Sequence, residues 1–370
     1  MRSRFFYVIT SACAIVGSVV GAGFITGAEI VTFFSSVNLL PACFLLFILL
    51  ALMFWILLSA GRRFGGLNKL NLRVLGRFSP IFNVATAVFS VISACSMCAA
   101  ADAVVSSVFS ISDKIPVLSL PLILVSCMVC KRGVRGVGVF NLCLVPIMIS
   151  VIIIACVGSG GVAVHEGSSD VHSIIIYACM NAFLVCPLIV DSGARADRKA
   201  VFPTAILSSA VISISVYLIM KKISTGYGTD ENLPLLSSVS SSWVFHSVFS
   251  VICVFGIVTT LISSHYNVLA FFSKYRVKRA LNVCFMLFAV AFSRIGLSRI
   301  VNGLYPLIGL FGLAYFILLS TVVFKDLFSP LADDSLYHGN ERVHPRCKQA
   351  QNKRGRKHQI HSENLPAVHD

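Results

Sequence analysis

The feature that most constrains this chain is a series of ten apolar stretches separated by short polar segments. A helix must have roughly 20 apolar residues to cross a hydrocarbon core about 30 Å thick. Only 12% of the 370 residues are charged, whereas soluble proteins carry about 25%. The sequence therefore predicts an all-α integral membrane protein with ten transmembrane helices. The spans cover approximately residues 5–32, 39–60, 80–109, 116–130, 137–158, 171–191, 201–220, 242–272, 280–294 and 303–324, of which the fourth and ninth are short.

Basic residues gather in the termini and in every second loop between the predicted spans, which lie on one side of the membrane. Of the 30 Lys and Arg residues, 25 fall in the termini and loops of one side and five on the other. The positive-inside rule then predicts a multi-pass protein of the plasma membrane (a bacterial inner membrane) with both termini cytoplasmic. This clustering accounts for the net charge of +15 without a nucleic-acid partner. The basic loop Gly61–Ser79 is either a short helix lying on the inner surface or a plain anchoring loop.

Several chemistries are not supported by the sequence. Most of the 13 cysteines lie inside apolar stretches. The CxxC pairs Cys95–Cys98 and Cys127–Cys130 lack the His or carboxylate neighbours of a zinc site, so small apolar filler is the better interpretation. No phosphate-binding GxxxxGK[ST] motif, HExxH motif or nucleophile elbow occurs. We therefore expect a protein that is not an enzyme and has no cofactor apart from a coupling ion.

Glycines interrupt the first apolar stretch. Gly17, Gly21 and Gly23 lie close together, followed by the acidic Glu29. Because each glycine costs a helix about 1 kcal/mol relative to Ala, the helix is predicted to unwind at Val20–Gly23. Unwound backbone at membrane depth survives only where it lines protein or a cavity, with amides that suit anions and carbonyls that suit cations. The alternative is a GxxxG-type packing face.

The ten spans divide into two halves of five, repeat one at about residues 5–165 and repeat two at about 166–325. The first span of the second half also carries interrupting residues, Asn181 and Pro187. Interrupted first spans in both halves are typical of inverted-repeat transporters, which predicts broken helices 1 and 6 in two inverted five-helix repeats. The transporter domain would cover residues 1–329, and residues 330–370 are predicted to form a disordered, basic, His-containing tail.

Four motifs carry a resemblance to a known family over about residues 5–325. Gly17–Phe24 resembles the unwound first helix of the LeuT-like fold. The longer VGAGFITGAEI resembles a motif of the YkvI-like family of membrane transporters, in the amino acid–polyamine–organocation superfamily. Similar to that family's sixth, eighth and tenth helices are Tyr177–Asn181, Ile257–Leu269 and Leu304–Gly309. Ala28, where the family often has Gln, and Ser263–His265 depart from the pattern.

The resemblance implies two binding sites. A sodium ion would lie between the carbonyls of Gly17 and Val20 and the hydroxyls of Thr259 and Thr260. Those hydroxyls could instead bond to their own helix, as membrane Thr residues do, and Ser263 and Ser264 are equally spaced alternatives. A substrate carboxylate would meet the N–H groups of Ala22 and Gly23. The pocket around it would be lined by Val20, Gly21, Phe24, Thr26, Asn181 and Ala182.

Three further polar residues lie within the spans and are candidates for a gate or a proton carrier, because ionisable residues are costly in a membrane. These are Glu29, Asp102 and His265. For Asp102 the alternative is contact with the outer interface. For His265 it is a core histidine bonded to a neighbour.

The sequence thus predicts a secondary active transporter that works by alternating access. A small solute, such as an amino acid or related zwitterion, would bind between spans 1, 3, 6 and 8, with Na⁺ or H⁺ as coupling ion. Spans 1, 2, 6 and 7 would rock against the others. The rival hypothesis is a nutrient-sensing receptor subunit of the same fold, which binds without transporting; a membrane enzyme is the weakest option. Partners are the solute and the lipid bilayer, and the oligomeric state stays open.

Overall fold

The computed structural model describes residues 2–109, 117–157, 170–224, 234–235, 243–272 and 278–328. Every regular element in these ranges is helical. Contacts divide the chain into two units, Met1–Val322 and Val323–Asp370, and the elements discussed below lie in the first apart from the end of the last helix. The predicted tail, residues 330–370, lies outside the described residues.

Helices cover all ten predicted spans. Within the described ranges, seven are long and apolar enough to cross a membrane, and the other three predicted spans hold shorter or broken helices. The first span contains α1 (Arg2–Val19), α2 (Ala22–Thr26) and α3 (Ala28–Phe34). The others contain α4 (Leu39–Phe64), α6 (Ser79–Phe109), α7 (Ser119–Cys130), α8 (Gly133–Val157), α9 (Val171–Gly193), α10 (Arg198–Ser224), α12 (Trp243–Phe271), α13 (Lys278–Phe292) and α15 (Tyr305–Phe328). Short turns η3 (Ser293–Ile295), α14 (Leu297–Arg299) and η4 (Ile300–Leu304) precede α15.

A helix also forms in the basic loop Gly61–Ser79, as predicted. It is α5 (Leu67–Leu75), followed by the single turn η1 (Gly76–Phe78). Its Asn71 is buried, donates to Asn83 Oδ1 of α6 at 2.6 Å and accepts from the Tyr315 hydroxyl of α15 at 2.8 Å. These contacts attach α5 to the helices beside it. Its position on a membrane surface stays a prediction.

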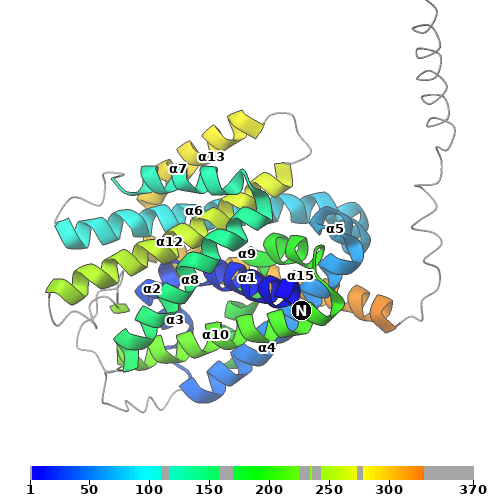
Figure 1. Ribbon diagram of the computed structural model, residues 1–370, viewed down its shortest axis with the longest axis horizontal. Helices are drawn as coiled ribbons and strands as arrows, with labels where there is room; N and C mark the ends of the chain where they lie inside the picture. Colours follow the sequence, from blue (N-terminus) through cyan, green and yellow to red (C-terminus); the bar gives the residue numbers. More distant parts are fainter. Residues whose placement is uncertain are drawn as a thin grey trace, which may run out of the picture. The chain divides into compact units, whose positions relative to one another are not determined.

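Helix α1 packs between two groups of helices (Figure 1). On one side, α4 packs against α9 and α10; on the other, α12 packs against α6, α7 and α8. The crossing of α4 and α9 is close because both helices have glycine there: Gly61 lies against the carbonyl of Val190, and Gly193 lies against the carbonyl of Leu58. Small residues at a crossing let two membrane helices approach each other's backbone.

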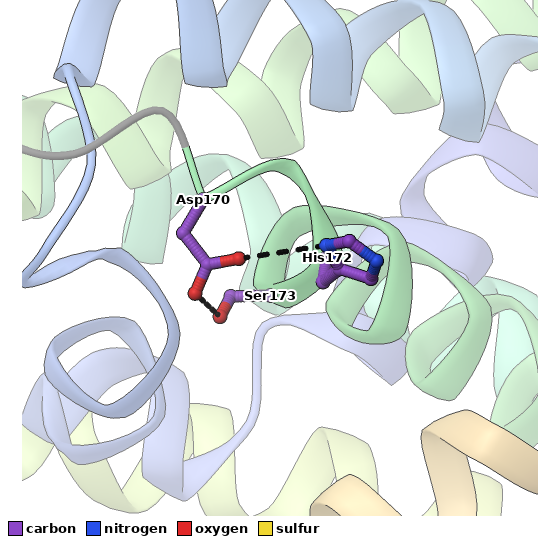
Figure 2. Close-up of polar contacts among 3 residues, drawn as sticks. All are labelled: Asp170, His172 and Ser173. Carbon is purple, nitrogen blue, oxygen red and sulfur yellow. Dashed lines mark hydrogen bonds and ion pairs between the residues drawn. The ribbon is translucent and has the colours of Figure 1, made fainter.

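Helix α9 begins beside Asp170. Ser173 Oγ donates to Asp170 Oδ2 at 3.1 Å, and His172 Nδ1 lies 3.8 Å from Oδ1 (Figure 2). The His172 side chain is 93% exposed, and exposed ion pairs contribute only about 0–1 kcal/mol. This cluster therefore marks the start of the helix and carries no site.

Helix α9 runs without a break from Val171 to Gly193, so the predicted interruption of the sixth span is wrong. Asn181 does not unwind the helix, because its Nδ2 donates to the carbonyl of Tyr177 one turn earlier, at 3.0 Å. Pro187 removes one backbone donor. Asn267 of α12 donates to the next carbonyl, that of Leu184, at 2.7 Å, and the helix continues past the proline.

Candidate functional site

The first span breaks where the glycines predict. Helix α1 ends at Val19 and α2 begins at Ala22, so Val20 and Gly21 are unwound. The N–H of Gly21 donates to the carbonyl of Val19 at 2.8 Å instead of to Gly17, four residues back. The break therefore releases the Gly17 carbonyl from the helix. Gly17 also allows close helix packing, as in the alternative of a GxxxG-type face. A Cβ at this position would lie 2.8 Å from Val145 Cγ2 on α8, which is too close.

A second break follows at Gly27, which the sequence analysis missed. Gly27 separates α2 from α3 and has φ +87°, a left-handed conformation that costs residues with a side chain about 1–2 kcal/mol. The turn brings α3 back beside α2. Glu29 consequently lies directly against Gly23: a Cβ built on Gly23 would overlap the Glu29 carboxylate.

Thr260 of α12 closes the first break. Its Oγ1 donates to the carbonyl of Gly17 at 3.1 Å and lies 3.4 Å from the carbonyl of Ser18. One turn further along α12, Ser263 Oγ donates to Ser18 Oγ at 2.5 Å. Residues three apart on a helix share one face, so Thr260 and Ser263 reach α1 together. The structure thus brings together the predicted pair Gly17 and Thr260, and adds Ser263.

Thr259 faces elsewhere. Its Oγ1 donates to the carbonyl of Gly256 in its own helix at 2.9 Å, which is the alternative that the sequence left open. The carbonyl of Val20 lies near Gly256, 3.2 Å from a Cβ built there. The other two predicted sodium ligands, the Thr259 hydroxyl and the Val20 carbonyl, therefore do not meet the Gly17 carbonyl.

A small cavity adjoins the break, and we call it the central cavity. Its volume is about 20 Å³, room for about one water molecule. It is lined from α1, α3, α6, α9, α12 and α15 and from Gly21, by Ser18, Val19, Gly21, Glu29, Ser93, Met97, Met180, Asn181, Leu184, Val185, Thr260, Ser263, Ser264 and Tyr305. Gly21, Asn181 and Glu29 are the predicted residues that line it together with Thr260. Val20, Phe24, Thr26 and Ala182 are buried but do not line it.

Glu29 is the only charged residue among those that line the central cavity, all of which belong to the described part of the chain. Its side chain is 4% exposed. Tyr305 of α15 lines the same cavity. When ionised, Glu29 gives the cavity a net negative charge.

Asp102 lies away from the central cavity. Its Oδ1 accepts the N–H groups of Leu118 and Ser119, both at 3.3 Å, where α7 begins. A carboxylate at this position satisfies amides that a helix start leaves without partners. The geometry therefore gives Asp102 a capping role rather than a place in the cavity.

His265 also lies outside the central cavity. Its Nδ1 is 2.8 Å from Ser126 Oγ on α7, and its ring stacks on Phe285 of α13 with centroids 4.6 Å apart. The residue is fully buried. This is the core histidine, bonded to a neighbour, that the sequence offered as the alternative.

A larger cavity of about 870 Å³ lies among α5, α6, α7, α9 and α12, and the sequence analysis did not predict it. We call it the basic-side cavity, because Lys69 and Lys131 line it. Asn267 lines this cavity and donates to the carbonyl of Leu184, which lines the central one. Beside it, the Tyr266 hydroxyl donates to Asp191 Oδ2 at 2.5 Å. The Asn267–Leu184 contact between α12 and α9 therefore lies at the boundary of the two cavities, whereas the Tyr266–Asp191 contact lies in the lining of the basic-side cavity.

No protein-family model matches the sequence, and no curated protein matches it. Solved structures do resemble it. A manganese transporter of Eremococcus coleocola superposes with TM-score 0.59 at 13% identity, over 86% of this chain and 79% of that one. Mhp1, a nucleobase-cation-symport-1 family transporter in a closed conformation with bromovinylhydantoin bound, superposes with TM-score 0.61 at 13% identity, over 84% and 77%. These likenesses confirm the LeuT-like fold; membership of the YkvI-like family stays a prediction.

Proposed function

We propose that this chain is a secondary active transporter that binds a small solute in the central cavity and moves it by alternating access. The observation that carries the proposal is the broken first helix, whose released Gly17 carbonyl is bonded by Thr260 beside a small cavity lined by hydroxyl groups and Glu29. Broken helices around a midplane site are how secondary transporters recognise solutes and ions. The fold shared with two kinds of transporter supports it.

The sizes of the cavities support alternating access. Pockets for small molecules usually measure about 300–1,000 Å³, whereas the central cavity measures about 20 Å³. Helices must therefore move before a solute can bind. Separation of Asn267, which lines the basic-side cavity, from Leu184, which lines the central cavity, would open a route between the two. By the positive-inside prediction that cavity faces the cytoplasm of a cell whose plasma membrane holds the protein.

For the coupling ion, the proposal is Na⁺ or H⁺. A sodium ion would use hard oxygen ligands, and the carbonyls of Gly17 and Ser18 with the Thr260 hydroxyl supply such atoms at the break. Manganese is less well supported as the transported solute of this chain, because within the described residues no three His, Cys, Asp or Glu side chains group as a metal site. The family resemblance favours an amino acid or related zwitterion as solute.

The test is uptake by the purified full chain in proteoliposomes, under a sodium gradient or a pH gradient, with a panel of amino acids and amines. Saturable accumulation that collapses with the gradient is the expected result. Binding of a solute, seen as a thermal shift, without accumulation under either gradient would instead support the nutrient-sensing receptor subunit. A ligand at 100 times its dissociation constant stabilises by about 2.7 kcal/mol, so binding is detectable on its own.

A further inference from the structure

A groove lies where α7 turns back into α8. The connection between the two helices is tight: Gly133 has φ +62°, in the left-handed region, and a Cβ built on Gly136 would lie 2.6 Å from the carbonyl of Val129. Glycine at both positions therefore lets the end of α7 approach the start of α8. We call the hollow beside this turn the α7–α8 groove, and its volume is about 810 Å³.

The turn divides its basic residues between two cavities. Lys131 lines the basic-side cavity, whereas Arg132 and Arg135 line the α7–α8 groove. No Asp or Glu occurs in residues 119–157, which include both helices. Neither guanidinium forms an ion pair with a residue that the structure describes. This end of the groove therefore carries a positive charge that the two helices do not balance.

The rest of the groove is apolar and faces outward. Met128 of α7 and Val139 of α8 are 66% and 44% exposed, and both line it. Arg135, Val139 and Cys143 follow one another at intervals of four residues, so they lie on one face of α8. Of the seven long apolar helices in the described ranges, α8 buries the smallest share of its apolar segment inside the protein. In a membrane, this outward face meets lipid chains.

An anionic phospholipid matches both parts of the groove. Arginines at the cytoplasmic end of a membrane helix need no ligand to be common there, but these two line a groove whose other side chains are apolar. Guanidinium groups bind phosphate oxygens through paired N–H···O hydrogen bonds. Basic pockets between transmembrane helices on the cytoplasmic side bind anionic headgroups, and the positive-inside prediction places this turn on that side.

We propose that the α7–α8 groove binds an anionic phospholipid of the cytoplasmic leaflet. Arg132 and Arg135 would hold the phosphate of the headgroup. One acyl chain would lie along Val139 and Cys143 of α8, against Met128 of α7. The site lies on the outer face of the helices, apart from the central cavity, so the inference does not depend on the proposed function.

The first test uses two cysteines of the unmodified chain as reporters. Cys143 and Cys284 are both exposed, and of the two only Cys143 lines the groove. The full chain in detergent receives dioleoylphosphatidylglycerol, dioleoylphosphatidylcholine or glycerol phosphate and is then treated with N-ethylmaleimide. Peptide mass spectrometry follows the modification of each cysteine. The two lipids share their acyl chains, and glycerol phosphate supplies the phosphate without them.

We expect phosphatidylglycerol to slow the modification of Cys143 more than phosphatidylcholine does, and the two lipids to affect Cys284 equally. Equal protection of Cys143 by both lipids would overturn the inference, and so would the same protection by glycerol phosphate. Protection of Cys143 that rises with protein concentration and not with lipid would assign the groove to a second copy of the chain, which also overturns it.

The second test compares variants by the mole fraction of phosphatidylglycerol that gives half of the thermal shift, since a bound ligand stabilises the folded chain. Arg132→Gln with Arg135→Gln removes both charges from the groove. The matched control is Arg62→Gln with Arg77→Gln, which removes two exposed arginines on the same predicted side, outside the groove. Val139→Trp fills the apolar part of the groove and keeps both arginines.

Loss of the two groove arginines should weaken phosphatidylglycerol binding by about 30-fold, or about five- to sixfold for each arginine. Val139→Trp should weaken binding as well, because the acyl chain loses its place, whereas the control pair should leave binding nearly unchanged. Equal losses in the groove pair and the control pair would show a general attraction of the basic side for anionic lipid and would overturn the specific site. No loss in the groove pair would overturn it too. The cysteine comparison on the unmodified chain decides the matter even if a variant does not fold.

Discussion

Two adjacent threonines on α12 provide a matched test of the broken helix. Thr260→Val removes the hydroxyl that donates to the Gly17 carbonyl across the break. Thr259→Val removes a hydroxyl of the same kind, one residue away, that bonds within its own helix. Both side chains are buried, with exposed fractions of 6% and 0%, and both changes replace a hydroxyl with a methyl group of similar size.

The two substitutions should lower the free energy of unfolding by different amounts, because the carbonyls that accept from the two hydroxyls differ in whether they keep another donor. The Gly17 carbonyl has lost its helical donor, since the Gly21 N–H bonds to Val19. Without Thr260 it is a buried acceptor that has lost its donor, which costs about 1–3 kcal/mol. The Gly256 carbonyl keeps the i+4 donor of a continuous helix when Thr259 loses its hydroxyl. Thr259→Val should therefore lower the free energy of unfolding by only about 0.5–1 kcal/mol.

The assay is unfolding of the purified chain in detergent, in sodium chloride and in choline chloride. We expect Thr260→Val to lower the free energy of unfolding more than Thr259→Val, and to abolish any stabilisation specific to sodium that Thr259→Val retains. Equal destabilisation by the two changes would refute the reasoning, because it would mean that the Thr260 hydroxyl is not what satisfies the break. A sodium effect lost only in Thr259→Val would refute the ion site at Thr260.

Three further substitutions test other parts of the structure by unfolding in detergent. Gly61→Ala places a methyl group against the carbonyl of Val190 at the crossing of α4 and α9 and should destabilise by about 1–3 kcal/mol, as overpacking does; an unchanged midpoint would contradict the close crossing. Gly27→Ala forces a side chain into a left-handed conformation and should cost about 1–2 kcal/mol; a neutral effect would contradict the second break. Tyr266→Phe removes the hydrogen bond to Asp191 and should cost about 1.5–3 kcal/mol, whereas a stabilising effect would show that this contact is strained.

The sequence by itself determined the all-helical architecture, the order of the apolar spans and the place of the first break. Long apolar stretches must be helical in a membrane, because each backbone donor and acceptor has to be satisfied within its own segment. Glycine weakens a helix wherever it lies, so Gly21 marked the unwound residues without knowledge of any neighbour. These are local properties, and they can be deduced from residue types and spacing.

Only the tertiary structure decided which side chains meet at that break. Thr259 and Thr260 have the same chemistry, but successive helical residues point about 100° apart, and the packing of α12 on α1 turns Thr260 toward the Gly17 carbonyl. Pro187 does not interrupt α9, although it removes one backbone donor, and only the structure shows this. Glu29 reaches Gly23 through a turn at Gly27 that brings α3 back beside α2. Helix rotation and donors from distant segments depend on packing, which residue spacing in one segment does not encode.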